Sequence, residues 1–388
     1  MTSATQSTFA PPVMEARRWI DGVTFPADKP LINVSQAAPV DPPPAPLRTE
    51  MARIIEADPG AHLYGPVLGL PELRAEVASQ WTAAYGGEVS PGHVAITSGC
   101  NQAFTATLAS LCGPGDEVIT PLPYYFNHAM ALDMASVRRV DLQTGDDLLP
   151  DPEQAARLMT PQTRAIVLVT PNNPAGVEYP ADLIRAFFEL ARSRGIALIV
   201  DETYRDFYSG AGAPHDIFSE PDWDKTLIQL YSFSKAYRLT GHRVGAMVAA
   251  PETLAEAEKY LDTVAICPPQ LGQRAALWGM RHLRQWLSGE RAEILDRRAA
   301  IEEAMPLLSD RGWQLLGCGA YFAYLRHPFD LSSLDLAQRL VTEAGILCLP
   351  GTMFMPAGQG GRELRVAFAN IDRAGIAEMF TRLAAFHP

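Results

Sequence analysis

The sequence predicts an α/β fold in which a mostly parallel central sheet is flanked by helices, followed by a smaller α+β domain. Three observations support this prediction. From about residue 48, short β-branched or apolar runs alternate with amphipathic stretches. Near residue 280 this alternating pattern is replaced by one long charged helical stretch. The chain has 388 residues, which is enough for two domains. Strands that alternate with helices form parallel sheets covered on both faces.

We expect three segments along the chain. Residues 1–47 are Pro-rich and should form an extended N-terminal segment that joins the small domain, since consecutive prolines cannot continue a helix or a central strand. Residues 48–282 should form the large domain and residues 283–388 the small C-terminal domain.

The elements follow from apolar spacing and from turn residues. Strands of the large domain are expected at residues 94–97, 117–120, 165–170, 197–200, 227–231 and 244–249. Helices are expected at residues 71–85, 101–112 and 181–194, the first with proline at its start. The small domain should contain a helix at residues 283–307 and strands at residues 321–325, 346–349 and 365–368.

Composition narrows the possible functions. The formal charge of −12 argues against a general nucleic-acid binder and against binding to anionic membranes. No signal-peptide pattern occurs at the N-terminus, and no run approaches the roughly 20 apolar residues of a membrane span. The five cysteines are scattered without a C-x-x-C pair, which argues against a disulfide framework or a metal site. We therefore expect a soluble cytoplasmic protein.

Lysine is scarce, and this shortens the list of candidate catalytic amines to Lys29, Lys225, Lys235 and Lys259. Signatures of other enzyme classes are absent from the sequence: there is no Walker loop, G-x-G-x-x-G, G-x-S-x-G or H-E-x-x-H. P-loop enzymes, dinucleotide-dependent dehydrogenases and zincins each lack their central motif here.

In open α/β sheets, ligands bind beyond the carboxyl ends of the strands. Residues 98–102 open a helix there, and its free N–H groups suit an anion such as phosphate. Residues 121–125 form a Pro-stiffened loop whose Tyr124 and Tyr125 offer a flat face to a planar ring. Each loop alone also fits an ordinary turn or local packing.

Three further loops carry polar groups. Asn173 lies in a rigid turn rich in proline and asparagine. Asp201 ends a buried strand and needs a partner, either a ligand nitrogen or an arginine. Lys235 has apolar neighbours that lower the pKa of an amine and favour a nucleophile or Schiff base. Together, the five loops supply the groups that a pyridoxal 5'-phosphate site requires.

The stretch from Tyr231 to Gly245, YSFSKAYRLTGHRVG, is close to an S-x-S-K…G-x-R-x-G signature. The chain thereby resembles the fold type I, class I/II aminotransferases that use pyridoxal phosphate, with matches in order from about residue 32 to 368. The resemblance implies ping-pong transfer of an amino group from an L-amino acid to a 2-oxo acid through a Lys235 aldimine.

The resemblance also implies roles for individual residues. Lys235, Asp201 and Tyr204 would be catalytic, with Asp201 on the pyridinium nitrogen and Lys235 shuttling a proton between the substrate Cα and the cofactor C4′. Tyr204 and Asn173 would bind the ring's phenolic oxygen. Tyr125 would stack on the ring, with Tyr124 as the alternative. Phosphate ligands would be Gly99, Cys100, Asn101, Ser232 and Arg243.

Substrate and partner contacts are implied in the same way. Arg365 would grip the substrate α-carboxylate, with Asn173 and Ala37 also against the substrate. Ala37 stands where the family usually has glycine, so its methyl group could reshape the pocket. Tyr64 would reach the phosphate of the neighbouring subunit, which implies a homodimer.

Two alternatives stay open at this stage. The same cofactor site serves lyases and cyclases that act at Cβ or Cγ of an amino acid, and the side-chain pocket decides between them. A non-catalytic regulator on this fold would carry an added DNA-binding domain, whereas the 47 residues before the large domain are Pro-rich with few basic residues.

Overall fold

The computed structural model describes residues 3–388. Its largest sheet has seven strands in the order β2-β8-β7-β6-β5-β3-β4. Every neighbouring pair is parallel except the two that β8 makes. In chain order the strands are β2 (Val94–Thr97), β3 (Glu117–Pro121), β4 (Arg138–Leu142), β5 (Thr163–Val169), β6 (Ala197–Asp201), β7 (Leu227–Ser232) and β8 (Gly245–Val248). The predicted mostly parallel sheet is confirmed.

Helices cover both faces of this sheet, because successive strand side chains point to opposite sides. In β6, Leu198 and Val200 pack on one face and Ile199 on the other. The first face is covered by α3 (Pro71–Tyr85), α7 (Ala181–Arg194) and α10 (Gln270–His282), and α2 (Ala45–Ala57) packs on the outside of α10. The second face is covered by α4 (Cys100–Leu111), α5 (Phe126–Met134) and α9 (Pro251–Ala265). We call this sheet with its helices the large domain.

The small domain is built on a four-stranded antiparallel sheet in the order β12-β13-β10-β9. Its strands are β9 (Gln314–Gly319), β10 (Phe322–Arg326), β12 (Leu349–Pro350) and β13 (Glu363–Val366). The helices beside it are α11 (Arg284–Ser309), α12 (Ser333–Arg339) and α13 (Arg373–Ala385). A short parallel pair, β1 (Ile32–Asn33) with β11 (Ile346–Leu347), ties the N-terminal segment to this domain.

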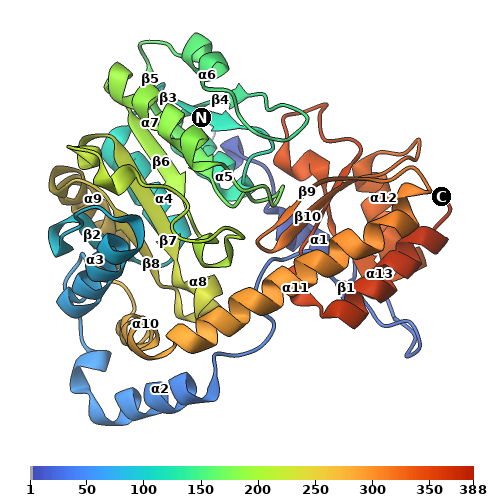
Figure 1. Cartoon of the computed structure of the whole chain (residues 1–388), viewed down its shortest axis with the longest axis horizontal. Helices are drawn as coiled ribbons and strands as arrows, with labels where there is room; N and C mark the ends of the chain where they lie inside the picture. The colour runs from blue at the N-terminus through green and yellow to red at the C-terminus, as the bar shows by residue number, and fades with distance from the viewer. Residues whose placement is uncertain (1–2) are drawn as a thin grey trace.

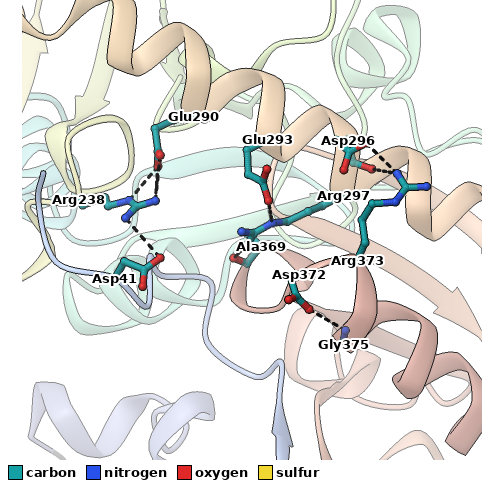
Figure 2. Close-up of polar contacts among 10 residues, drawn as sticks. All are labelled: Asp41, Arg238, Glu290, Glu293, Asp296, Arg297, Ala369, Asp372, Arg373 and Gly375. Atoms are coloured by element: carbon teal, nitrogen blue, oxygen red, sulfur yellow. Dashed lines mark hydrogen bonds and ion pairs between the residues drawn. The ribbon is translucent and has the colours of Figure 1, made fainter.

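Helix α11 connects the two domains, running in Figure 1 from the sheet on the left to the small domain on the right. Figure 2 shows the polar contacts along it. Arg238 forks onto Glu290 with bonds of 2.8 and 2.9 Å and also lies 3.3 Å from Asp41. Arg297 donates to the carbonyl of Ala369 in the small domain at 2.6 Å. The helix is thus fastened to the large domain, the N-terminal segment and the small domain.

The N-terminal segment differs from the expected extended chain. It contains α1 (Pro12–Arg18), and α2 already begins at Ala45. Prolines occupy the first turns of both helices, where a missing N–H removes no intrahelical hydrogen bond. The domain boundaries at residues 47/48 and 282/283 stay a prediction. Within residues 3–388, no helix is both long and apolar enough to cross a membrane.

Candidate active site

A cavity of about 400 Å³ lies at the carboxyl ends of β5, β6 and β7, where the strand-following loops meet α1 and β13. The cavity brings together most of the residues predicted from the sequence. Those that line it are Ala37, Cys100, Asn101, Tyr125, Asn173, Asp201, Tyr204, Ser232, Lys235, Arg243 and Arg365. They come from seven separate stretches of the sequence, so the fold and not local sequence creates the cavity.

Lys235 lies in the short helix α8 (Phe233–Ala236), directly after β7. Its Nζ donates a hydrogen bond to the carbonyl oxygen of Ala37. Burial lowers the pKa of Lys235 to about 8, and the nearby guanidinium groups of Arg365 and Arg243 act in the same direction. At neutral pH the amine is still mostly protonated, but its neutral fraction is far larger than that of an ordinary lysine, and a nucleophile or proton acceptor requires this neutral form.

Asp201 is the last residue of β6 and lies at the floor of the cavity. Its Oδ1 accepts the backbone N–H of Thr203 at 3.0 Å, and its Oδ2 lies 3.2 Å from Nε2 of His128. Burial would raise the pKa of Asp201, but the polar contacts with His128 and Thr203 outweigh it and the pKa falls below its usual value. The carboxylate therefore stays ionised although it is buried.

A positively charged corner forms where α4 begins. Gly99 has φ +90°, and a side chain there would collide with the Arg243 guanidinium, so only glycine lets the two approach. Arg243 donates to the carbonyl of Thr240 at 3.0 Å and lies 3.5 Å from Ser234 Oγ. Within residues 3–388 it has no carboxylate within 4 Å. With the free N–H groups of the first turn of α4, this corner suits an anion.

Cys100 borders the same corner, and its side chain is buried beside Asp201 and Thr203. Burial and the neighbouring Asp201 charge raise the pKa of the Cys100 thiol far above its usual range. A thiol in that state is a poor nucleophile.

Arg365 lies on β13 and is 2% exposed. One of its Nη atoms donates to Asn173 Oδ1 at 3.0 Å, and the other donates to the carbonyl of Ser35. Burial lowers the pKa of Arg365 to about 10, and its Nε has no hydrogen-bond partner in the part of the chain that the structure describes. No carboxylate of the described chain pairs with this buried cation, which therefore favours an anionic ligand.

The two candidate aromatic residues of the loop after β3 point in different directions. Tyr125 lines the cavity, and its ring stands edge-on to His128 with centroids 5.0 Å apart. Tyr124 instead donates its hydroxyl to the carbonyl of Met355 at 2.8 Å and does not line the cavity. Tyr204 also lines the cavity, and its ring packs against Tyr321 and Phe322. Tyr125 is thus the residue placed to face a planar ligand.

Two predicted residues lie outside the cavity lining. Gly99 lies behind it, against Arg243. Tyr64 is 79% exposed and does not line the cavity of its own chain. Its neighbour Gly65 donates its N–H to Cys267 Sγ at 3.5 Å, which places Tyr64 beside the segment that follows α9.

The sequence prediction missed several residues of the site. His128 is fully buried on α5, and its only sequence signal is its position three residues after Tyr125. Thr203 and Ser234 lie between predicted residues and were passed over. Arg17 and Gln36 line the cavity from the segment that was expected to be extended, so no sequence signal pointed to them.

Comparison with known proteins places this site in a family. Residues 28–383 match the model of a family described as "Aminotransferase class I and II". The chain belongs to this family. It is 30% identical over 338 residues to the aromatic aminotransferase ISS1 of Arabidopsis thaliana, covering 84% of this chain and 81% of that protein. It is 26% identical over 371 residues to an aspartate aminotransferase of Sulfolobus acidocaldarius, covering 92% and 90%.

Solved aminotransferase structures have the same fold. An aspartate aminotransferase variant of Thermus thermophilus superposes with a TM-score of 0.88 at 23% identity, covering 99% of this chain and 98% of that chain. N-succinyldiaminopimelate aminotransferase of Mycobacterium tuberculosis is similar to 99% of this chain, with a TM-score of 0.87 and 23% identity. The protein is an aminotransferase of this family, and the lyase alternative is not favoured.

Proposed function

We propose that this aminotransferase binds pyridoxal 5'-phosphate in the described cavity and moves an amino group from an L-amino acid to a 2-oxo acid by a ping-pong mechanism. One observation carries the proposal. A partly buried lysine of lowered pKa shares the cavity with a buried ionised carboxylate and with a buried arginine that has no acidic partner among residues 3–388. In the proposed reaction, the lysine supplies the amine, the carboxylate pairs with the pyridinium nitrogen, and the arginine binds the carboxylate of the substrate.

The residues present fit the cofactor. The corner formed by Cys100, Asn101, Ser232 and Arg243 would hold the phosphate, and the missing Cβ of Gly99 leaves room for the guanidinium. Asp201 would pair with the ring nitrogen. Tyr125 would cover one face of the ring, and Asn173 with Tyr204 would bind its phenolic oxygen. When bound, pyridoxal phosphate supplies an electron sink for the charge that develops at the substrate Cα.

The protein's own groups then perform the remaining tasks. Arg365 binds the substrate α-carboxylate through its planar fork, with Asn173 holding the guanidinium in place. Lys235, neutral in part because of its lowered pKa, takes the proton from Cα of the amino-acid donor and, in the second half of the ping-pong cycle, delivers a proton to Cα of the 2-oxo acid acceptor. Burial raises the pKa of Tyr204, so its hydroxyl stays protonated and donates a hydrogen bond.

We further propose a homodimer in which Tyr64 completes the phosphate site of the partner. Leu63, Tyr64, Val264 and Ile266 are exposed apolar side chains, and the Gly65 contact with Cys267 brings their two segments together. Ile266 has φ +61°, a strained conformation for a β-branched residue that a functional contact would justify. A cytoplasmic location stays a prediction.

The decisive experiment is an absorbance titration of the holoenzyme with a panel of amino acids, with the 2-oxo acid products identified. Arg365→Met should raise KM for the amino-acid donor by roughly 100-fold, because a buried charge-assisted clamp is lost. Arg362→Met removes an exposed arginine three residues away and serves as the control. Ammonia release without an acceptor would indicate a lyase, and no reaction with any amino acid would contradict the proposal.

A further inference from the structure

Three cationic side chains of the cavity bind to three consecutive residues of the N-terminal segment. Arg365 donates to the carbonyl of Ser35, and Lys235 donates to the carbonyl of Ala37. Between them, Arg17 Nη2 donates to the side-chain oxygen of Gln36 at 2.6 Å. Ser35 and Ala37 are separated by at most about 7 Å, so the three cations converge on a region the size of one small substrate.

Two of these cations have roles in the proposed reaction, but Arg17 has none. It lines the cavity at the mouth and is exposed to solvent. Among residues 3–388 it has no carboxylate within 4 Å, and its Nε and Nη1 make no hydrogen bond within the chain. Arg17 therefore offers unused guanidinium N–H groups next to the site of reaction.

The position of Arg17 is fixed by packing. The preceding residue, Ala16, is completely buried in an apolar cluster with Phe126 and Phe354. Gln36 is itself held, because its backbone carbonyl accepts from Asn370 Nδ2 at 2.6 Å. Arg17 is thus anchored through its helix at one end and through Gln36 at the other, over the opening of the cavity.

We propose that Arg17 determines substrate specificity by binding a second negative group, so that the preferred substrates are amino acids with an acidic side chain and the matching 2-oxo dicarboxylates. The inference rests on the proposed function, since it takes Arg365 as the clamp for the α-carboxylate. A guanidinium binds a carboxylate through two parallel hydrogen bonds, and Arg17 retains free donors for this.

Family membership does not settle this substrate class. The named relatives include both aspartate and aromatic aminotransferases. Two apolar side chains of α1, Val13 and Met14, also line the cavity and suit either the methylene groups of an acidic side chain or an aromatic ring. The charge of Arg17 is the feature that favours the acidic side chain.

The test compares the holoenzyme with Arg17→Met and with the matched control Arg18→Met, since Arg18 is also exposed but does not line the cavity. Succinate, a dicarboxylate without an amino group, is titrated by calorimetry. Arg17→Met should weaken succinate binding about 10-fold, because one charge-assisted contact at a partly exposed site is lost, whereas Arg18→Met should not change it.

Kinetics supply the second readout. The ratio of kcat/KM for L-glutamate or L-aspartate to that for L-phenylalanine should fall about 10-fold in Arg17→Met. Equal succinate binding in Arg17→Met and wild type, or a wild-type preference for phenylalanine over both acidic donors, would overturn the inference and leave the aminotransferase proposal standing. If succinate binding depends on Arg17 but no amino acid donates an amino group, the inference that Arg17 binds a second negative group is supported and the proposed function is contradicted.

Discussion

His128 Nε2 lies 3.2 Å from Asp201 Oδ2, and both side chains are almost completely buried beneath the cavity. The imidazole is fixed by stacking on Phe104, with ring centroids 3.8 Å apart and planes 20° from parallel. Among residues 3–388, Nδ1 has no hydrogen-bond partner, and Nε2 makes only its 3.2 Å polar contact with Asp201. His128 is therefore positioned to hold the Asp201 carboxylate, and any effect on the proposed cofactor would pass through that carboxylate.

Replacing His128 with leucine should raise the pKa of Asp201, because the largest contacts that oppose burial are lost while those with Thr203 remain. A carboxylate with a lowered pKa loses its charge only at acidic pH, so a raised pKa moves this loss toward neutrality. Affinity of the apoprotein for pyridoxal phosphate should fall about 10-fold at neutral pH and further at mildly acidic pH.

Absorbance titrations of the apoprotein with pyridoxal phosphate across this pH range measure the effect. His128→Asn keeps a polar group near Asp201 and should recover part of the affinity. A variant that is merely less stable would lose affinity equally at all pH values. Superimposable pH curves for His128→Leu and wild type would show that His128 has no influence on Asp201.

Lys235 should reduce the stability of the protein when no cofactor is bound. Burial lowers its pKa from the usual 10.5 to about 8, so at neutral pH the folded state holds a charged amine in an unfavourable environment. The unfolded chain binds this proton more tightly, and stability attributable to Lys235 rises as pH increases from about 8 to 10.5. At neutral pH the shift corresponds to roughly 3 kcal/mol of destabilisation.

Lys235→Met should accordingly unfold at higher urea concentration than the wild-type apoprotein at pH 7, and the difference should shrink above pH 8. Lys225→Met provides the control, because Lys225 is an exposed lysine paired with Asp222. If the two variants change stability by the same small amount at every pH, the lowered pKa of Lys235 is wrong.

Gly176 marks a close approach between the two domains. It follows Asn173 in the turn after β5 and has φ +74°. A Cβ there would lie 2.5 Å from the Phe322 carbonyl oxygen and 2.6 Å from the Gly319 nitrogen, both on the β9–β10 hairpin. The turn that carries Asn173 therefore rests directly on the backbone of the small domain.

Gly176→Ala should destabilise the protein by more than about 2 kcal/mol, since it adds a steric clash to the cost of a positive φ. Gly195→Ala is the matched control, because Gly195 has φ +63° with open space around it and should cost only about 1 kcal/mol. Urea unfolding measures both. Because Asn173 moves with the turn, Gly176→Ala should also raise KM for amino-acid substrates, whereas Gly195→Ala should leave KM unchanged.

The sequence predicted those site residues that come directly after a strand of the parallel sheet. Asn173, Asp201 and Lys235 each come directly after a buried parallel strand, and the carboxyl ends of such strands meet at one edge of the sheet. Strand β4 (Arg138–Leu142) escaped prediction because it lies at the edge of the sheet and begins with two arginines. Its sequence therefore lacks the continuous apolar run of a central strand.

Residues brought to the site by tertiary packing could not be predicted in this way. His128 lies on a helix whose other residues are mostly apolar, and only the packing of α5 against α4 turns it toward Asp201. Arg17 lies in a segment whose prolines suggested an extended chain, although they start helices there. A proline can interrupt a helix, but it can also occupy the first turn of one. The sequence alone did not show which of these two cases applies to the N-terminal segment.

Tyr64 gives the sharpest test of the proposed dimer, because it is 79% exposed in the single chain and cannot serve its own cavity. Tyr64→Ala and Lys235→Ala should each be inactive or severely impaired alone. Mixing them after partial unfolding allows a dimer in which one site has Lys235 from the first chain and Tyr64 from the second. Random pairing makes half of the dimers mixed with one complete site each, so about a quarter of wild-type activity should return. The recovered activity requires a contribution from both chains, and mass spectrometry verifies that mixed dimers have formed. If the activity of the mixture then does not exceed the sum of the activities of the two separate variants, Tyr64 does not act across the interface.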